Sequence, residues 1–206
     1  AADYRLAADL AQKGYWEEIR KLARTNLKVI KRAAAGYNPD YIRNPYERLS
    51  DHRRKMIAPI EPPTDVFIQN WLNTPYEPRK FEPDSPEYST LSRIRVRSKS
   101  EALIGDSLDK LGIPYKYECP LYLKSLGRVI HPDFTLLHIE RRQEYYLEHC
   151  GMMDNPGYAE NAIRRVNDYI QNGIVPGDRL LLTMESTRHP LNRKNLEAML
   201  HGVFGK

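Results

Sequence analysis

The sequence predicts an α/β protein whose regular part follows the order helix, three strands, helix, strand, or αβββαβ. Two helical segments, opening at Ser98 and at Asn155-Pro156, end at similar stop signals, Gly112-Ile113-Pro114 and Asn172-Gly173-Ile174. Between them lie three runs rich in aromatic and aliphatic residues, which we interpret as strands: Tyr117–Lys124, Arg128–Leu137 and Glu144–Cys150. A fourth strand, Arg179–Met184, and a last helix, Asn192–Phe204, complete the pattern.

The composition is that of an ordinary globular protein. The chain has 206 residues, of which 41% are hydrophobic and 29% charged, and a net charge of +5. Its apolar runs, such as Leu180–Leu182, are far shorter than the ~20 residues of a membrane span, and the N-terminus has no secretion signal pattern. Two cysteines are too few for a disulfide framework. We therefore expect a cytoplasmic protein without a membrane partner. The first residue is not methionine, and we expect a piece of a longer protein.

The prolines divide the chain. Nine of the 15 fall between residues 37 and 86, among seven aromatic residues. A solvated linker has no use for so many aromatic side chains, so we expect an ordered arm that wraps across the core. Within it, Pro63–Asn73 is predicted to be a short helix packed through Val66, Phe67 and Trp71. The predicted parts are a helical head, 1–36, a Pro- and aromatic-rich connecting arm, 37–92, and the core, 93–206.

The head is predicted to form one or two amphipathic helices over residues ~4–35. Apolar residues recur there at three- and four-residue spacing, and Gly14 is the expected break. A basic stripe runs along the same segment: Arg20, Arg24, Lys28 and Lys31. Such a helix is a candidate for a homo-oligomer or partner interface, or for contact with phosphates. The alternative is a solvated face.

Three carboxylates stand at unusual places in the predicted core. Glu101 shares the apolar face of its helix, although Ser98-x-x-Glu101 is also a capping box. Asp133 follows Pro132, which we expect to kink a strand and aim the carboxylate, with a turn aspartate as the alternative. Glu148 ends an apolar strand, where an ordinary strand-end charge is the alternative. A hairpin would make Asp133 and Glu148 neighbours, and convergent carboxylates are the usual protein share of a Mg²⁺ site.

Four short motifs lie in order along these elements. They are Arg97-Ser98-Lys99-Ser100-Glu101, Pro132-Asp133-Phe134-Thr135, Glu148-His149-Cys150-Gly151-Met152 and Asn172-Gly173-Ile174. Together, over residues 95–186, they resemble the PD-(D/E)XK, or restriction-endonuclease-like, nuclease superfamily, in particular an uncharacterised bacterial branch. The resemblance implies a restriction-endonuclease-like αβββαβ core, here with an N-terminal helical extension and a Pro-rich arm.

The resemblance also implies an activity and its residues. It implies phosphodiester hydrolysis with Mg²⁺ or Mn²⁺ as cofactor. By position, Asp133 and Glu148 would hold the metal, with the backbone carbonyl of His149 as a further ligand. Glu101 would be the helix carboxylate that binds the metal directly or through water.

One position departs from the family pattern. The family's lysine, two residues after the strand acid, is Cys150 here, and a thiol supplies no positive charge. His149 is a poor substitute because residues 148 and 150 share one strand face and 149 points away. Arg165, seven residues after Tyr158 on the same helix face, resembles a relocated lysine, and its permanent charge suits phosphate but not proton abstraction. Lys99 and Lys124 are the fallback candidates.

Basic residues precede the first core helix. Arg93, Arg95, Arg97 and Lys99 alternate along the chain, and if extended they would project on one side and neutralise a nucleic-acid backbone. The alternative is a solvated basic strand. A zinc set of Cys119, His131, His149 and Cys150 is disfavoured because its spacing matches no finger or ribbon.

The sequence thus predicts a metal-dependent nuclease, with DNA favoured over RNA and an endonuclease mode favoured. The alternative is a nuclease-fold module without catalysis that binds nucleic acid or a protein partner. The Cys150 departure motivates that alternative.

Overall fold

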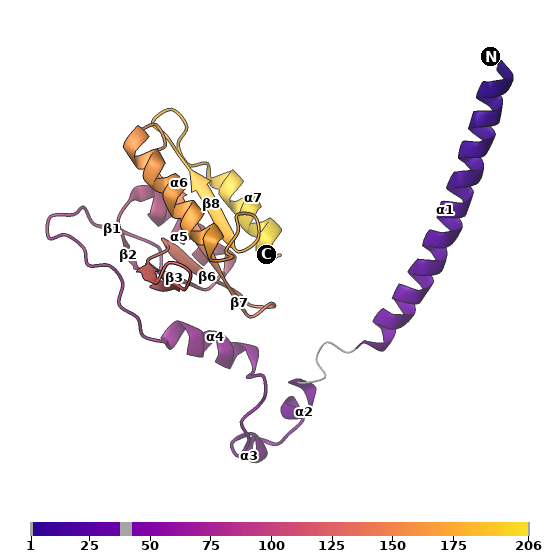
Figure 1. The fold of residues 1–206 in the computed structure, drawn as a ribbon. Coiled ribbons are helices and arrows are strands. Elements are labelled where there is room, and N and C mark those ends of the chain that lie inside the picture. The colour runs from indigo at the N-terminus through magenta and orange to yellow at the C-terminus, as the bar shows by residue number, and fades with distance from the viewer. Residues whose placement is uncertain (1, 38–42, 206) are drawn as a thin grey trace. The chain divides into compact units, whose positions relative to one another are not determined.

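The computed structural model describes residues 2–37 and 43–205 (Figure 1). The chain divides between Pro63 and Thr64 into two compact units. This division falls inside the segment that the sequence predicts as one connecting arm. The beginning of that arm, residues 38–42 with Pro39 and Tyr41, lies outside the described residues.

The first unit is helical and contains α1 (Ala2–Gly36), α2 (Arg43–Glu47) and α3 (Asp51–Arg54). The helix α1 runs through Gly14 without interruption, so the break expected there is absent. Its described side chains are exposed, including large apolar ones such as Trp16 and Leu22. Among the described residues, we find no helix that combines the length and the apolar content needed to cross a bilayer.

The second half of the predicted arm packs on the core. The helix α4 (Thr64–Asn73) confirms the short helix expected there. Trp71 donates its indole N–H to Glu144 Oε1 at 2.8 Å, while Val66, expected to pack, is 42% exposed. Further along, the strands β1 (Tyr88–Ser89) and β2 (Arg95–Val96) form a small antiparallel sheet.

The core is a mixed four-stranded sheet covered by helices. Its strands are β3 (Tyr115–Tyr117), β6 (Phe134–His138), β7 (Gln143–Cys150) and β8 (Leu180–Met184), in that spatial order. The pairs β3–β6 and β6–β7 are antiparallel, and β8 is parallel to β7. The crossover to β8 runs through α6 (Pro156–Gln171), because a parallel pair needs a long connection.

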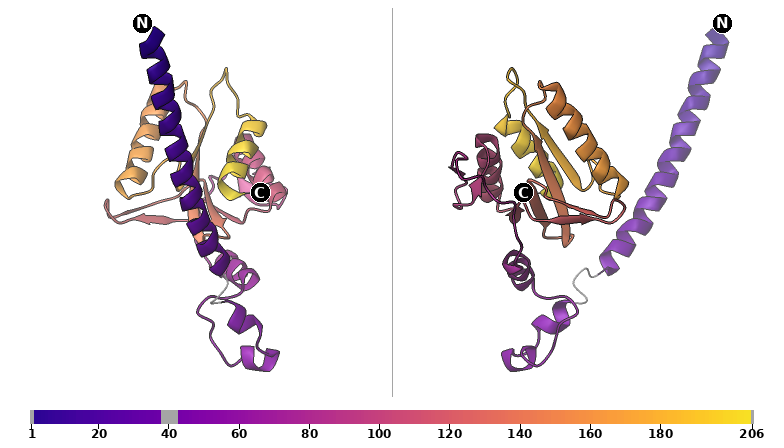
Figure 2. Two further views of the ribbon diagram at one scale, coloured as in Figure 1. Left: turned by 90° about the vertical axis from the view of Figure 1, so that its right-hand side faces the viewer. Right: turned by 60° about the vertical axis from the view of Figure 1, so that its left-hand side comes forward.

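Helices cover both faces of this sheet (Figure 2). The helices α5 (Lys99–Leu111) and α7 (Arg193–Phe204) pack on one face, and α6 packs on the other. Alternation along β7 sends Tyr145 and Leu147 toward α5 and α7, and Tyr146 toward α6. Glu148 therefore faces α6. The α/β class and the order of helices and main strands are as the sequence predicts.

Two of the predicted strands are wrong in their extent. The run Tyr117–Lys124 is interrupted at residues 118–120, and Arg128–Leu137 is interrupted at residues 131–133. Each run contains a proline, which cannot donate to a strand ladder. The outer halves, β4 (Leu121–Leu123) and β5 (Arg128–Ile130), pair with each other as a separate hairpin. The expected kink at Pro132 is confirmed as a complete break.

The helix boundaries follow their sequence signals. Asn155 caps α6 by accepting the Tyr158 N–H, and Pro156 is the first helical residue. Gly112 after α5 adopts a left-handed conformation with φ of 61°, which favours glycine. The apolar spacing over residues 158–170 predicts that Ile170, near the end of α6, points inward, which is wrong because its side chain is 44% exposed.

Gly105 in α5 allows the β1–β2 segment to approach the helix. A Cβ atom at this position would lie 2.4 Å from Cγ2 of Thr90. We expect Gly105→Ala to lower the free energy of unfolding by about 1–3 kcal/mol, because overpacking outweighs the better helix propensity of alanine. Thermal and urea unfolding followed by circular dichroism measure this.

The clash has a specific rescue. Thr90→Ser removes Cγ2 and keeps the hydroxyl that contacts Tyr115, so the double variant Gly105→Ala/Thr90→Ser should regain most of the lost stability. Gly14→Ala is the matched control, because no atom lies within 4 Å of its added Cβ, and it should not destabilise. A Gly105→Ala protein as stable as the wild type would contradict this packing.

Candidate functional site

Asp133 and Glu148 lie side by side at one end of the β6–β7 pair. The antiparallel register pairs Phe134 with Leu147, so Asp133 stands one residue further on, opposite Glu148. Asp133 Oδ2 accepts the backbone N–H of His149 at 2.7 Å. The predicted neighbourhood of the two carboxylates is thus present in the structure.

Burial perturbs both carboxylates. It raises the pKa of Asp133 well above its ordinary value of 3.8, and the nearby Glu148 raises it further. Glu148 is 5% exposed, and burial raises its pKa as well, although Arg165 opposes that shift. Glu101 adds a smaller repulsion to each carboxylate. This end of the sheet therefore favours a proton or a cation.

Arg165 and Tyr169 of α6 hold the Glu148 carboxylate. Arg165 Nη2 donates to Glu148 Oε1 at 2.8 Å, and its Nε lies 2.7 Å from Oε2. The Tyr169 hydroxyl donates to Oε1, and Arg165 also donates to the backbone carbonyl of His131. Burial lowers the pKa of Arg165, but the interaction with Glu148 outweighs this and raises it overall.

The structure therefore places Arg165 at the acidic pair, where the sequence predicts a replacement for the missing lysine. Tyr169 was not predicted as a site residue. It stands one helical turn after Arg165 on the same face of α6, a spacing that brings side chains together. The apolar spacing of the helix predicts only that Tyr169 points inward.

Cys150 and Tyr158 complete the wall of the site beyond Glu148. Burial raises the pKa of the Cys150 thiol to about 11, and Glu148 adds to this, so the thiol is neutral at pH 7. The Tyr158 hydroxyl donates to the His149 carbonyl at 3.3 Å and accepts the Gly151 N–H at 3.0 Å. The carbonyl predicted as a metal ligand thus has a hydrogen-bond donor beside it.

The His149 side chain points away from the acidic pair, as strand alternation predicts. Its Nδ1 lies 2.9 Å from Thr183 Oγ1, and its Nε2 lies 3.2 Å from Glu185 Oε1. Ser100 donates to the same Glu185 oxygen at 2.7 Å. This polar network ties β7, β8 and α5 together on the other face of the sheet. Sequence analysis missed it because no local motif links these positions.

Glu101 forms hydrogen bonds that involve backbone N–H groups at the start of α5, as the capping alternative predicts. Its backbone N–H donates to Ser98 Oγ at 3.1 Å. Its carboxylate Oε2 accepts the Arg97 N–H at 2.8 Å and the Tyr117 hydroxyl at 2.7 Å. These donors hold Glu101 outside the group of residues that line the acidic cavity. Its influence on Asp133 is through its charge.

The predicted row of four basic side chains does not form, because the segment is not extended throughout. Arg93 has a φ of 62° in a turn, and Lys99 is the first residue of α5. Arg97 makes two hydrogen bonds to Glu118, at 2.8 and 2.9 Å. Arg95 packs over Phe81, with 4.4 Å from its guanidinium to the ring centre.

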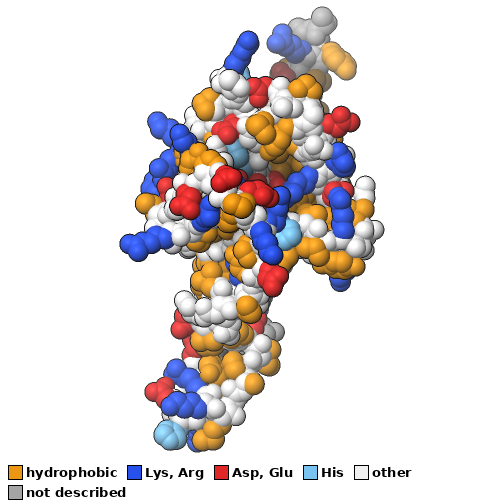
Figure 3. All heavy atoms as spheres, turned by 90° about the vertical axis from the view of Figure 1, so that its left-hand side faces the viewer, with side chains coloured by type: hydrophobic (Ala, Val, Ile, Leu, Met, Phe, Trp, Pro, Cys, Tyr) orange, Lys and Arg blue, Asp and Glu red, His pale blue; other side chains and the backbone are white. Residues whose placement is uncertain are grey.

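Lys124 is exposed in the turn of the β4–β5 hairpin, which is bound to the C-terminal end of α6 through Ser125 and Asn172. Lys124 is therefore not among the residues that line the acidic cavity. Lys99, the other fallback, is exposed and also outside it. Figure 3 shows acidic and basic side chains interspersed over one face of the molecule, without a continuous basic patch.

The acidic pair opens into a cavity of about 510 Å³. One lining residue, Arg79, comes from the Pro-rich segment and was not predicted, since nothing in its local sequence marks it. The lining residues are Arg79, Asp133, Glu148, His149, Cys150, Tyr158, Asn161, Ala162, Arg165 and Val166.

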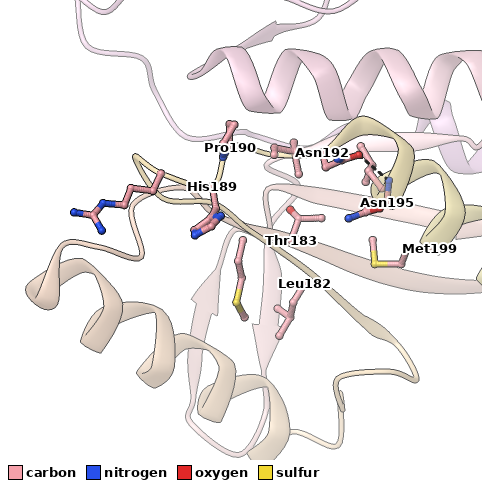
Figure 4. Close-up of a pocket in the computed structure, with 11 residues that line it drawn as sticks. Leu182, Thr183, His189, Pro190, Asn192, Asn195 and Met199 are labelled. Carbon is pink, nitrogen blue, oxygen red and sulfur yellow. Dashed lines mark hydrogen bonds between the residues drawn. The ribbon is translucent and has the colours of Figure 1, made fainter.

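A larger cavity of about 600 Å³ lies between β8 and α7. Figure 4 shows that Thr183, His189, Asn195 and Met199 come to it from the strand, the following loop and the helix. Its lining contains no carboxylate or thiol. The carboxylates therefore lie in the smaller cavity, while the larger one offers His189 as its titratable side chain near neutral pH.

The acidic pair fits a hard divalent cation in part. Mg²⁺ is usually bound through one or two carboxylates and keeps several waters, and the raised pKa values show that positive charge is favoured here. Asp133 and Glu148 supply two such ligands. Within residues 2–37 and 43–205, no group of three or more His, Cys, Asp or Glu side chains is arranged to hold a metal ion.

Comparison with protein-family models, curated proteins and solved structures found no match.

Asp133 should destabilise the fold at neutral pH. Because its pKa is raised in the folded state, the cost of ionisation is absent below the unfolded value of 3.8 and grows as the pH rises toward the folded value. We expect Asp133→Asn, measured with a chelator present, to raise the Tm at pH 7. The gain should shrink as the pH falls toward 4.

Asp154→Asn is the matched control. Thr187 hydrogen bonds lower the pKa of this exposed carboxylate, so its contribution has the opposite sign. Asp154→Asn should lower the Tm slightly at pH 7, and the difference should fade in acid. An Asp133→Asn gain that stays constant from pH 4 to 8 would contradict the assigned cause.

Proposed function

We propose that this protein is a metal-dependent nuclease that hydrolyses phosphodiester bonds, with DNA as the favoured substrate and an endonuclease mode. The observation that carries the proposal is a pair of carboxylates at a cavity that also contains Arg165: the buried Glu148 on β7 and the partly buried Asp133 just before β6. Two such carboxylates are the usual protein contribution to a Mg²⁺ site in phosphoryl-transfer enzymes.

The motifs support the proposal by their position in the fold. The resemblance to the PD-(D/E)XK superfamily rests on residues at the start of α5, at the start of β6, at the end of β7 and just after α6. A restriction-endonuclease-like classification of the mixed sheet is part of this proposal. A cytoplasmic location is also part of this proposal.

Asp133 and Glu148 would hold Mg²⁺ or Mn²⁺, with the His149 carbonyl beside them. The bound ion would polarise a phosphate oxygen and a water. Tyr158 orients the His149 carbonyl, and Glu101 contributes negative charge from α5. The fit is not complete, because Arg165 and Tyr169 already contact the Glu148 oxygens.

Arg165 supplies the positive charge that Cys150 lacks. Its guanidinium reaches the acidic cavity while it orients Glu148, and its charge is permanent. It is suited to stabilising negative charge that accumulates on a phosphate. It is not suited to removing a proton from water, so we assign it no role as a base.

The alternative is a nuclease-fold module that binds nucleic acid or a protein partner without cleavage. One contact favours it: the ion pair of Arg165 with both oxygens of Glu148 competes with a metal ion for the same carboxylate. The nuclease proposal requires that metal binding and cleavage depend on Asp133, and the alternative does not.

The nuclease proposal predicts cleavage of DNA in the presence of Mg²⁺ or Mn²⁺ and none with a chelator. Asp133→Asn should reduce the rate by about a hundredfold or more, because one of two carboxylate ligands is lost. Asp154→Asn, which removes an exposed carboxylate outside the cavity, should cleave at the wild-type rate. Gel assays on DNA and RNA panels measure both.

Cleavage that survives Asp133→Asn would overturn the assignment of the site. Tight nucleic-acid binding without cleavage and without metal dependence would favour the alternative. Mg²⁺ should also raise the Tm of the wild-type protein more than that of Asp133→Asn, because a ligand that binds only the folded state stabilises it.

We further propose that α1 mediates homo-oligomer formation. Ile19 and Leu22 of this 35-residue helix are exposed, and most of the stability of a helix in a protein comes from packing of its apolar face. Burial against a second copy would stabilise it. Analytical ultracentrifugation should show association that the double variant Ile19→Glu/Leu22→Glu abolishes, whereas Lys21→Glu should not. A wild-type protein that sediments as a monomer up to high concentration would exclude this.

A further inference from the structure

Arg79 lines the acidic cavity although it belongs to the Pro-rich segment, outside every motif of the core. The segment reaches this position because several contacts hold it. Lys116 of β3 donates to the Thr74 carbonyl at 3.2 Å and lies over the rings of Trp71 and Tyr76. Upstream of Arg79, the chain is thus bound to the edge strand of the sheet.

Downstream of Arg79 the chain is held by arginines of the core. Arg97 Nη2 lies 3.2 Å from the carbonyl oxygens of both Arg79 and Lys80 and donates to them. The guanidinium groups of Arg95 and Arg97 lie 4.4 and 4.5 Å from the centre of the Phe81 ring. The backbone at Arg79 is therefore fixed on both sides, while its side chain remains 56% exposed.

The charge of Arg79 is only weakly neutralised by the protein. Its nearest recorded acidic partner is Glu118 at 3.9 Å, but the buried Glu118 carboxylate already makes two short hydrogen bonds to Arg97. An ion pair of 3.9 Å at an exposed side chain contributes little. Arg79 thus keeps a positive charge at the cavity.

The charge of the other cation of the cavity, Arg165, is already balanced in part by Glu148. Arg165 pairs with Glu148 through two nitrogens, and Cys150 carries no charge at neutral pH. A phosphodiester that enters a cavity with two carboxylates needs positive charge from the protein as well as from any metal. Among the described residues that line the cavity, Arg79 is the guanidinium that has no carboxylate within hydrogen-bond distance.

We propose that Arg79 binds a phosphate group of the nucleic-acid substrate at the mouth of the acidic cavity. This inference rests on the proposed nuclease function and adds to it a substrate-binding residue from the Pro-rich segment. The bidentate geometry of a guanidinium suits phosphate oxygens better than a lysine ammonium does. The arm is then part of the substrate-binding surface of the core.

The test compares Arg79→Ala with Arg79→Lys and with the neighbouring control Lys80→Ala. Lys80 is also exposed, but it does not line the cavity. DNA binding is measured by fluorescence anisotropy over a range of salt concentrations, with Ca²⁺ in place of Mg²⁺ so that an oxygen-binding cation is present. Cleavage is measured separately in Mg²⁺, and thermal melts confirm that each variant is folded.

Arg79→Ala should weaken DNA binding about tenfold, the loss of one charge-assisted hydrogen-bonding group. The slope of log affinity against log salt should fall by about 0.9, the value for one lost phosphate contact on duplex DNA. Arg79→Lys should keep the slope and lose part of the affinity, whereas Lys80→Ala should leave both near wild type. A merely structural role for Arg79 would not produce this change in slope.

The outcomes separate the two proposals. If the wild type binds DNA and Arg79→Ala matches Lys80→Ala in affinity and slope, the inference fails while the nuclease proposal stands. If the predicted changes in binding occur but the wild type does not cleave in Mg²⁺, the inference stands and the nuclease proposal fails. A wild-type protein that neither binds nor cleaves DNA overturns both.

Discussion

The close placement of two desolvated carboxylates, Glu148 on β7 and Asp133 just before β6, is the constraint around which this end of the core is built. Asp133 and Glu148 lie opposite each other where water is largely excluded, so their charges repel and each is desolvated. The backbone N–H of His149, the guanidinium of Arg165 and the hydroxyl of Tyr169 offset this cost in part. A structure that served stability alone would not place two carboxylates here.

The surrounding strands and helix position the two carboxylates. The break at Pro132 ends the β5 strand and starts β6 one residue after Asp133, so the carboxylate stands at a strand end and not in a continuous ladder. Arg165 and Tyr169 lie one helical turn apart on α6, whose crossover position sets it over β7. On the opposite face, His149, Thr183 and Glu185 bind β7 to β8. The pair is therefore supported from both faces.

The Pro-rich segment is bound to the core through its aromatic side chains. Its aromatic side chains are bound by cationic residues of the core, as Trp71 and Tyr76 are by Lys116 and Phe81 is by Arg95. These contacts hold the part of the segment after Thr64 against the core. They also redirect the basic residues before α5, since Arg95 and Arg97 contact the arm and Glu118 where a row along nucleic acid was expected.

The sequence by itself determined the α/β class, the helix boundaries and the neighbourhood of Asp133 and Glu148. These depend on local signals: the asparagine caps, the Gly-Ile stops and the proline before Asp133. The sequence did not determine that two predicted strands are each split in two, because strand pairing depends on residues that are far apart in the sequence. Likewise, local sequence allows Glu101 to be a cap or a ligand, and its hydrogen bonds with the Tyr117 hydroxyl and the Arg97 N–H depend on the tertiary structure. Glu185 and Arg79 contact their networks across distant segments, which no spacing along the chain encodes, and the helical spacing of Tyr169 from Arg165 does not reveal its contact with Glu148.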